Sequence, residues 1–396
     1  MGTLGRSRQK AVDPVSLNIG INASRARSGG GVAHLLGILR ECDPRALGIE
    51  KIHVWSYDKL AAALPEVSWL EKHVPDALNK PLYQQLLWES CSLPVALRRM
   101  NCQILLNVDA GSLCRFRPAV TMSRDMLSYE PGEIERYGFS VARLRLIALR
   151  YVQNSSLRSA DGVIFLTNYA ASVIQQSCGT LKNIVQVPHG VGAEFLNQGE
   201  IQQNSRGAIR CLYVSNALPY KHQWHVIEAV ARLRERGYDL LLDLVGGGEG
   251  AAQNRLLAKL KERDPKQLFV TQQAFVPQHT LPALLSSADL FIFASSCENM
   301  PNTLVEAMAA GLPIACSDRG PMPEVLKDGG VYFDPENPDS IANAIEDLLL
   351  HPQKCQQLAA RARELASQYS WRRCAEETFS FIVQTALQAR DAVKIH

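Results

Sequence analysis

Residues 295–324 read SSCENMPNTLVEAMAAGLPIACSDRGPMPE, and this stretch decides the fold of the chain. It follows the apolar run LFIFA at residues 290–294, which has the length and aromatic content of a buried parallel strand. A polar turn comes next, and the pattern then predicts a helix over Thr303–Ala310. Gly311 stands where a left-handed residue ends a helix, and Pro313 prevents the helix from continuing.

Two glutamates follow this predicted strand. Glu298 lies on the loop after the strand, and Glu306 lies in the helix after that loop. Ligands of open α/β sheets bind at the carboxyl ends of the strands, so both carboxylates are expected to face a crevice. Each residue has an alternative interpretation. Glu298 is then a solvated loop acid, and Glu306 is the last member of a capping box that begins at Thr303.

The spacing of Glu298 and Glu306 resembles the E-x7-E signature of retaining glycosyltransferase family 4, whose members have the GT-B fold. The segments EAMAAGLPIA and RGPMPEVL resemble the helix, strand and next turn of that family. The resemblance implies an α/β fold class, with two Rossmann-like doubly wound domains facing a central cleft. It implies that Glu298 approaches the donor sugar and that Glu306 holds the ribose of the nucleotide. It also implies that neighbouring loop residues bind the donor, namely Asn299, Met300, Pro301 and Asn302.

Length and composition are those of a folded protein of two domains, with 396 residues, 46% hydrophobic and 20% charged. The ten cysteines contain no C-x2-C pair, so neither a zinc ribbon nor a disulfide framework is indicated. No apolar run approaches the ~20 residues of a spanning helix. Residues 1–10 are basic without a following apolar region, which predicts a disordered tail and no signal peptide. A cytoplasmic location is expected, either free or peripheral at the inner face of the membrane.

Four parts are predicted along the chain: an acceptor-side domain over residues 1–190, a linker over 191–207, a nucleotide-sugar-binding domain over 208–370 and a returning helix over 371–396. Residues 1–190 hold 22 Lys and Arg against 15 Asp and Glu, a net charge of +7, whereas the remainder has a net charge of −4. A basic first domain suits an anionic acceptor or an anionic membrane surface. The total charge of +3 is too small to indicate nucleic acid.

The first predicted strand, residues 16–22, leads to the glycines of SGGG and then to an apolar helix. A helix N-terminus after such a turn accepts phosphate, so Gly30 and Gly31 are expected to bind the donor. The alternative is a tight turn that only needs small residues. The spacing is not G-x-G-x-x-G, which argues against a nicotinamide site.

Arg124 lies in the segment VTMSRDM, where many members of the resembled family carry a histidine–aspartate pair. An arginine there binds a carboxylate or a phosphate through two hydrogen bonds, or it is a surface residue at a strand end. Further along, residues 140–158 combine four arginines with an apolar face. Such a helix either lies on an anionic bilayer or covers a sheet. We assign its apolar face to the sheet and its arginines to the surface.

In the second half, the strand Ile209–Val214 precedes a loop that ends at Lys221. The resemblance places Lys221 at the lysine that binds the donor diphosphate and Asn216 where the family has an arginine. A cation there stabilises the charge that builds up on a leaving diphosphate. The alternative for Lys221 is an exposed lysine at a helix entry. After a strand at 268–271, the family's backbone contacts the nucleotide base at positions that correspond to Phe275 and Val276.

The function implied is retaining transfer of a hexose from a nucleotide-diphosphate sugar to a hydroxyl of a glycan or lipid-linked acceptor, in cell-surface polysaccharide synthesis. No D-x-D triplet occurs, so no metal and no cofactor beyond the donor substrate are expected. Glu298, Lys221 and Arg124 are the expected catalytic residues. Two alternatives stay open: a nucleotide-sugar epimerase of the same fold, and a non-catalytic subunit that binds a nucleotide sugar.

Overall fold

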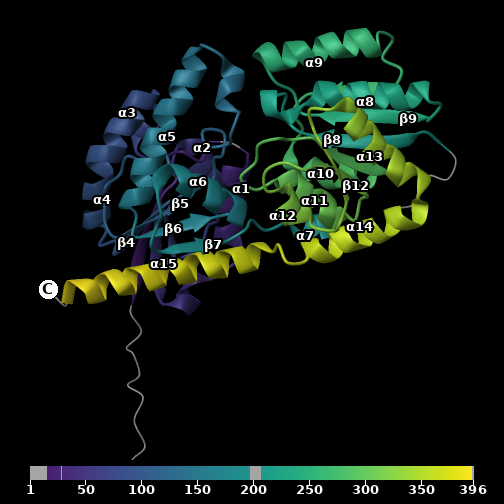
Figure 1. Ribbon diagram of the computed structural model, residues 1–396. Coiled ribbons are helices and arrows are strands. Elements are labelled where there is room, and N and C mark those ends of the chain that lie inside the picture. Colours follow the sequence, from purple (N-terminus) through teal and green to yellow (C-terminus); the bar gives the residue numbers. More distant parts are fainter. Residues whose placement is uncertain (1–15, 28, 197–206, 395–396) are drawn as a thin grey trace, which may run out of the picture.

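The computed structural model describes residues 16–27, 29–196 and 207–394. The tail predicted at residues 1–10 therefore lies outside the described residues, and so do residues 197–206 of the linker predicted over 191–207. The chain forms two α/β domains side by side, each with a parallel sheet between helices (Figure 1). The predicted fold class, two Rossmann-like domains, is thereby confirmed.

The first domain has a seven-stranded parallel sheet in the order β3-β2-β1-β4-β5-β6-β7. Its strands are β1 (Leu17–Asn22), β2 (Ile49–Trp55), β3 (Leu70–His73), β4 (Ile104–Asn107), β5 (Ala119–Met122), β6 (Gly162–Phe165) and β7 (Ile184–Gln186). Its longer helices are α1 (Gly30–Arg40), α2 (Asp58–Ala63), α3 (Leu82–Leu87), α4 (Leu93–Arg99), α5 (Val141–Ser159) and α6 (Asn168–Cys178). Short helical turns are η1 (Pro44–Leu47), η2 (Asp76–Asn79), η3 (Trp88–Ser92) and η4 (Ile134–Tyr137).

The second domain has a six-stranded parallel sheet in the order β10-β9-β8-β11-β12-β13. Its strands are β8 (Ile209–Val214), β9 (Leu240–Val245), β10 (Val270–Gln273), β11 (Leu290–Phe293), β12 (Ile314–Ser317) and β13 (Val331–Phe333). Its helices are α8 (Gln223–Glu235), α9 (Gly250–Arg263), α10 (Leu281–Ser286), α11 (Asn302–Ala310), α12 (Met322–Leu326), α13 (Pro338–Leu350) and α14 (Pro352–Ala366). The short helix α7 (Ala193–Leu196) precedes this domain in the chain. Two short helical turns lie within the domain, η5 (Pro219–Lys221) and η6 (Gln278–Thr280).

The strand order reverses once in each sheet. In the first domain β1 pairs with both β2 and β4, and in the second β8 pairs with both β9 and β11. Connections leave such a point in opposite directions, which opens a crevice beyond the carboxyl ends of the strands. The glycine loop before α1 and the loops after β8 and β11 all begin at these two points. The fold therefore directs the predicted donor-binding loops to the crevice side of each sheet.

Two features of the secondary structure are absent from the predictions made above. The segment before α15 forms two helices, because α13 ends at Leu350 and α14 starts at Pro352. Proline lacks the N–H that a continuous helix needs and restricts the residue before it. Strand β3 was not predicted, since its sequence LEKH contains no apolar run. It is an edge strand, and all four of its residues are half-buried.

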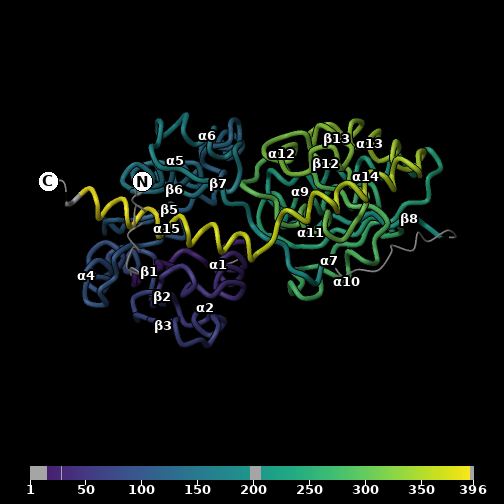
Figure 2. Tube along the Cα trace, turned by 90° about the horizontal axis from the view of Figure 1, so that it is seen from below, coloured from purple at the N-terminus to yellow at the C-terminus, as the bar shows by residue number. Residues whose placement is uncertain are grey.

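Helix α15 (Trp371–Lys394) leaves the second domain and lies along the first (Figures 1 and 2). At the crossing, Val191 pairs with Ser370 in an isolated parallel bridge. The ring of Trp371 packs where a Cβ on Gly37 of α1 would overlap it, so a glycine is required there. These contacts join the two domains where the chain crosses between them, once after Val191 and once after Ser370.

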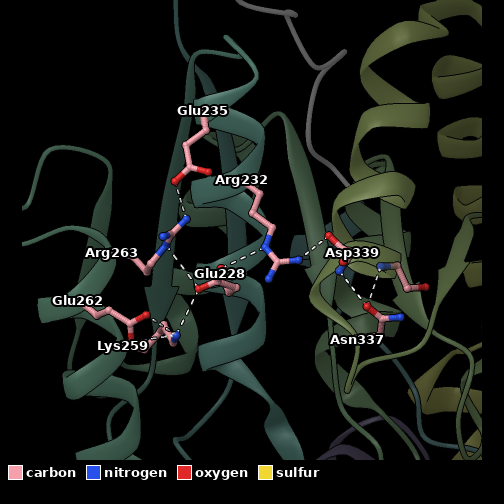
Figure 3. A network of polar contacts seen from close by, with 9 residues as sticks. Glu228, Arg232, Glu235, Lys259, Glu262, Arg263, Asn337 and Asp339 are labelled. Carbon is pink, nitrogen blue, oxygen red and sulfur yellow. Dashed lines mark hydrogen bonds and ion pairs between the residues drawn. The ribbon is translucent and has the colours of Figure 1, made fainter.

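A charge network fixes the helices on one face of the second sheet (Figure 3). Glu228 of α8 accepts hydrogen bonds from Arg232 at 3.0 Å and from Lys259 of α9 at 3.2 Å. Arg232 also pairs with Asp339 at the start of α13. Burial opposes ionisation of Glu228, but the surrounding cations outweigh it and lower the pKa of this carboxyl group.

Helix α5 departs from the prediction that its apolar face covers the sheet. Leu146 and Leu157 are buried, whereas Val141, Leu144 and Tyr151 are exposed. The helix thus packs mainly through its second half and leaves apolar side chains of its first half in solvent. None of the helices in the described ranges combines the length and the apolar character needed to cross a membrane.

Candidate active site

Lys221 and Glu298 form an ion pair at the crevice side of the second sheet. Lys221 ends the turn η5 after β8, and Glu298 lies on the loop after β11. Both side chains are largely buried, and the Lys221 ammonium group lies 5.3 Å from the centre of the Tyr220 ring. Neither alternative interpretation holds, because Glu298 is not a solvated loop acid and Lys221 is not an exposed lysine. The structure instead brings together the two residues that were assigned to different parts of the donor.

Glu306 is buried within α11, with 8% of its surface exposed. Burial, followed by the charge of the nearby Glu194, raises the pKa of its carboxyl group to about 8, although a hydrogen bond with Gln278 acts in the opposite direction. The capping-box interpretation is wrong: Pro301 precedes the helix without a side-chain cap, and the Thr303 hydroxyl donates instead to the Val214 carbonyl at 3.5 Å. A buried carboxyl group that is neutral near pH 7 can exchange hydrogen bonds with sugar hydroxyls.

The loop between Glu298 and α11 contacts the first domain. The Asn299 side-chain amide donates to the Ser123 carbonyl at 3.4 Å, and the Asn299 carbonyl accepts from the Thr167 hydroxyl at 3.0 Å. Met300 and Pro301 are buried beside it. The side-chain oxygens of Asn299 and Asn302 are buried without a hydrogen-bond partner among the described residues. A buried acceptor without a protein partner is available to a water molecule or to a donor group of a ligand.

Gly30 and Gly31 face that loop from the first domain. A Cβ on Gly30 would lie 3.1 Å from the Asn302 amide nitrogen, and a Cβ on Gly31 would overlap the guanidinium group of Arg124. The turn therefore needs small residues, as one interpretation held, but it needs them because cleft side chains pack against it. Through the contact of Gly30 with Asn302, the loop after β1 packs against the N-terminus of α11 across the domain boundary.

Arg124 lies beneath the glycine turn, at the end of β5. Its Nη1 donates to the Val108 carbonyl at 3.5 Å, whereas its Nε is buried and has no partner in the described part of the chain. Burial lowers the pKa of this guanidinium group, and the neighbouring Asp109 opposes that shift. The residue is therefore a partly buried cation with an unmet donor, and the interpretation as a surface residue is wrong. Such a group binds an anion strongly.

A histidine pair that spacing alone did not reveal lies next to Arg124. The Nδ1 atoms of His34 in α1 and His189 after β7 are 2.6 Å apart, and Trp371 packs against both rings. Burial, followed by the charge of Arg124, lowers the pKa of His189 to about 3, and burial also lowers that of His34. Both rings are therefore neutral at pH 7, and one donates its proton to the other.

A second contact that the sequence did not reveal joins the domains near Lys221. The Ser296 hydroxyl donates to Glu133 of the first domain at 2.7 Å and lies 2.9 Å from His222 Nε2. His222 has a left-handed backbone, with φ of 48°, at the entry to α8. Burial lowers the pKa of His222 to about 3, so the ring is neutral and accepts or donates one hydrogen bond. Glu133 in turn pairs with Arg136 at 2.9 Å.

The remaining predicted residues lie at the outer part of the second domain's loops. Asn216 is exposed on the loop after β8. Phe275 follows β10 with 79% of its surface exposed, and Val276 is half-buried against the core. The exposed ring of Phe275 is available to stack on an aromatic base. Within the described ranges, none of these three residues forms a hydrogen bond or an ion pair with Lys221 or Glu298, so their predicted roles stay predictions.

The second domain matches a known family. Residues 198–365 fit the model of the family described as glycosyl transferases group 1. The chain is 29% identical over 172 residues to the O-antigen chain mannosyltransferase B of Escherichia coli, covering 43% of this chain and 44% of that protein. It is 27% identical over 260 residues to the GDP-mannose-dependent alpha-(1-6)-phosphatidylinositol monomannoside mannosyltransferase of Mycolicibacterium smegmatis, covering 59% and 64%. The chain thus spans between 44% and 64% of the length of these relatives.

Solved structures share the whole architecture. Sucrose-phosphate synthase from Thermosynechococcus elongatus superposes with a TM-score of 0.74 at 17% identity, covering 96% of this chain and 100% of that one. The protein HepE of Anabaena, in complex with UDP and glucose, gives a TM-score of 0.67 at 19% identity, covering 96% and 99%. WaaG, a glycosyltransferase involved in lipopolysaccharide biosynthesis, gives 0.69 at 16%, covering 92% and 99%. The fold is therefore the GT-B arrangement of two Rossmann-like domains.

Proposed function

We propose that this chain is a retaining, metal-independent glycosyltransferase that moves a hexose from a nucleotide-diphosphate sugar to a hydroxyl of a glycan or lipid-linked acceptor. The observation that carries the proposal is the pairing of Lys221 with Glu298 at the reversal point of the second sheet, with buried Glu306 in the following helix. The match of residues 198–365 to glycosyl transferases group 1 supports it. So do the names of the relatives, which are mannosyl- and glucosyltransferases.

When the donor binds, the ion pair between Lys221 and Glu298 opens, and each residue contacts a different part of the donor. The Lys221 ammonium group turns from Glu298 to the donor diphosphate, whose charge grows as the bond to the anomeric carbon breaks. Glu298 is then free to accept hydrogen bonds from hydroxyls of the transferred sugar. The acceptor oxygen bonds to the anomeric carbon on the same face, and its proton goes to the released diphosphate. The chain contains no D-x-D triplet, so in this proposal cationic side chains and backbone amides meet the leaving-group charge.

The first domain completes the site from the other side. Arg124 offers its unpartnered Nε to an anionic group of donor or acceptor, beneath the turn of Gly30 and Gly31. Glu306, neutral near pH 7, exchanges hydrogen bonds with the ribose hydroxyls. Asn299 and Asn302 offer buried oxygens to further hydroxyl donors. The cleft therefore presents cations for the phosphates and neutral acceptors for the sugar.

The acceptor side is assigned to the first domain and to an anionic membrane surface. Phe139 and Leu144 are exposed around the start of α5, and the guanidinium carbon of Arg143 lies 5.7 Å from the centre of the Phe139 ring. A hollow of about 460 Å³ nearby is lined by Arg150 and Arg158 among others. Exposed apolar side chains beside arginines suit the interface of an anionic bilayer. This assignment agrees with a cytoplasmic, peripheral location.

One observation favours a second candidate, a non-catalytic subunit that binds a nucleotide sugar. Asn216 is exposed and uncharged where the resembled family has an arginine. A weakened diphosphate clamp would retain binding and lose transfer. An epimerase would in contrast convert the donor without any acceptor. The three functions differ in what they release.

The test measures release of nucleoside diphosphate from a panel of nucleotide sugars, with and without lipid-linked acceptors. The proposed function predicts release that depends on the acceptor and falls at least tenfold in Lys221→Ala. The matched control is Lys266→Ala, an exposed lysine of the same domain. Binding of a nucleotide sugar without release under every acceptor would show the non-catalytic subunit. A modified sugar formed without acceptor would show the epimerase.

A further inference from the structure

Four side chains share one face at the outer edge of the first sheet. The parallel register places His53 of β2 beside Glu71 of β3, and Trp55 beside His73. Side chains two residues apart on a strand lie on the same face, so the two imidazoles and the carboxylate converge. β3 is the last strand of the sheet. The cluster is thus two strands away from β1, whose loop enters the cleft.

The distances within this cluster match those of metal ligands. His53 Nδ1 and His73 Nε2 are 3.0 Å apart. The Glu71 carboxylate lies between them, with Oε2 at 3.5 Å from His53 and Oε1 at 3.8 Å from His73. A tetrahedral zinc ion with bonds of about 2.0–2.2 Å holds its ligand atoms roughly 3.3–3.5 Å apart. Small side-chain rotations are therefore enough to place all three ligands around one ion.

We propose that His53, Glu71 and His73 bind one divalent transition-metal ion of the zinc class. Two imidazoles and a carboxylate suit zinc, copper or nickel, whereas magnesium and calcium prefer sets of oxygens. Each ring keeps its one proton on the far nitrogen, so both lone pairs face the ion. A water molecule takes the fourth position, since Glu71 is 45% exposed and the site opens to solvent there.

Neighbouring groups hold the ligands in place. The ring of Trp55 stacks on that of His73, with centres 4.7 Å apart and planes 17° apart. His53 is buried, which fixes its position. The Lys51 ammonium group forms an ion pair with the Glu71 carboxylate at 3.9 Å, a distance too long for a hydrogen bond. Such supporting contacts orient ligands before the ion arrives.

A bound ion would tie the edge strand to the sheet. β3 is four residues long and half-buried throughout, and edge strands of this kind separate easily. The ion joins β2 to β3 through side chains, beyond their backbone hydrogen bonds. This site is distinct from the donor cleft, and the proposal does not depend on the proposed glycosyl transfer.

The test is calorimetric titration of chelator-treated protein with zinc, in a Cys91→Ser background that removes the exposed thiol. One zinc ion per chain is expected, with binding lost in His73→Ala and weakened at least tenfold in Glu71→Gln. The matched control is His351→Ala, which removes an exposed histidine that also lies beside a carboxylate, Asp347. Circular dichroism of each variant checks that it is folded. If His73→Ala does not fold, Glu71→Gln, which changes a side chain that is 45% exposed, tests the proposal alone.

Two further readouts separate this site from other binding. Cobalt should quench Trp55 fluorescence, and Trp55→Phe should remove this quenching. Zinc should raise the melting temperature by about 3–5 °C, whereas magnesium and calcium should not. The proposal is overturned if wild-type protein binds no zinc at 100 times the protein concentration, or if Glu71→Gln and His73→Ala bind zinc as the control does. In that case His53 and His73 form only a hydrogen bond with each other.

Discussion

The ammonium group of Lys221 is ion-paired with the carboxylate of Glu298, 77 residues further along the chain. The pair couples the loop after β8 to the loop after β11. Each partner neutralises the other, so a donor diphosphate must compete with Glu298 for the lysine. Substitution of Lys221 should therefore lower the affinity for the free nucleotide, whereas substitution of Glu298 should not.

Lys221→Ala should weaken the binding of nucleoside diphosphate by about 10- to 100-fold, because a hydrogen bond to a charged group contributes roughly 1.5–3 kcal/mol. Glu298→Gln should leave that affinity unchanged or slightly raised, since it releases Lys221, while turnover falls. Calorimetry with the free diphosphate and turnover with the full donor separate the two effects. If both variants lose the same affinity for free diphosphate, the division of roles between Lys221 and Glu298 is wrong.

Glu306→Gln should stabilise the protein in alkaline solution. The pKa of Glu306 is about 8 when folded, against 4.5 for a free side chain, so its contribution to stability is largest below pH 4.5 and is lost as the pH rises through 8. The slope for one such group is about 1.4 kcal/mol per pH unit. Urea unfolding at pH 4.5, 6 and 8 measures the difference between variant and wild type.

The exposed acid Glu249 gives the control for this series, because Glu249→Gln should show no such trend. Glu306→Gln should also weaken the donor and the free diphosphate by similar factors, as expected when ribose binding is the same in the ground and transition states. A constant gap in stability across the pH range would contradict the buried, neutral state of Glu306.

Gly31→Ala should displace Arg124, because the added Cβ overlaps its guanidinium group. We expect a loss of transfer of about tenfold with a small change in melting temperature, since the overlapping atoms are the end of a side chain. The double variant Gly31→Ala with Arg124→Ala should be no worse than Arg124→Ala alone. Gly207→Ala, which has open space around its Cβ, is the control. Additive losses in the double variant would show that Gly31 acts without Arg124.

Glu324→Gln should loosen the contact between the domains. From α12, Glu324 accepts from the backbone N–H groups of Asn168 and Tyr169, each at 2.8 Å, at the N-terminus of α6 in the first domain. A carboxylate at a helix N-terminus stabilises by about 0.5–2 kcal/mol. X-ray scattering should show a larger radius of gyration in the variant. Glu364→Gln, within α14, should change nothing, and an unchanged radius in Glu324→Gln would contradict this role.

Leu144→Ser should reduce binding to anionic vesicles, because burial of a leucine contributes about 1.5–3 kcal/mol. Leu268→Ser is the matched control, since both leucines are 68% exposed and Leu268 lies in the second domain. Sedimentation at low salt and near 1 M salt, where screening shortens to about 3 Å, tests the part played by Arg143 and its neighbours. Equal binding of the two variants would remove α5 from the membrane contact.

The sequence predicted the elements that short stretches of residues determine, but it did not predict contacts between residues that are far apart in the chain. The strand, loop and helix around Glu298 follow from a short apolar run and from Gly311, and the structure has them within a residue or two. The capping box failed because the helix starts at Asn302, so Thr303 is inside it. The strand β3 has no apolar run, and its position is fixed only by pairing with β2.

No pattern in the sequence indicated the contacts between residues that are far apart along the chain. His34 and His189 are 155 positions apart, and only the folding of α1 against the chain after β7 joins them. The packing of Arg124 against Gly31 likewise depends on how two loops meet across neighbouring strands. Residue type and strand-end position suggested that these loops face the crevice. Which side chains meet there was decided by packing.

The most direct test of the central claim is the anomeric configuration of the product. The protein is incubated with GDP-mannose or UDP-glucose and a lipid-linked acceptor, and the new linkage is read by nuclear magnetic resonance, with Lys221→Ala and Lys266→Ala in parallel. We predict that both donors, which carry α-linked sugars, yield only α-linked product, formed by the wild type and by Lys266→Ala and lost in Lys221→Ala. A β-linked product, or equal product from Lys221→Ala, would contradict the account.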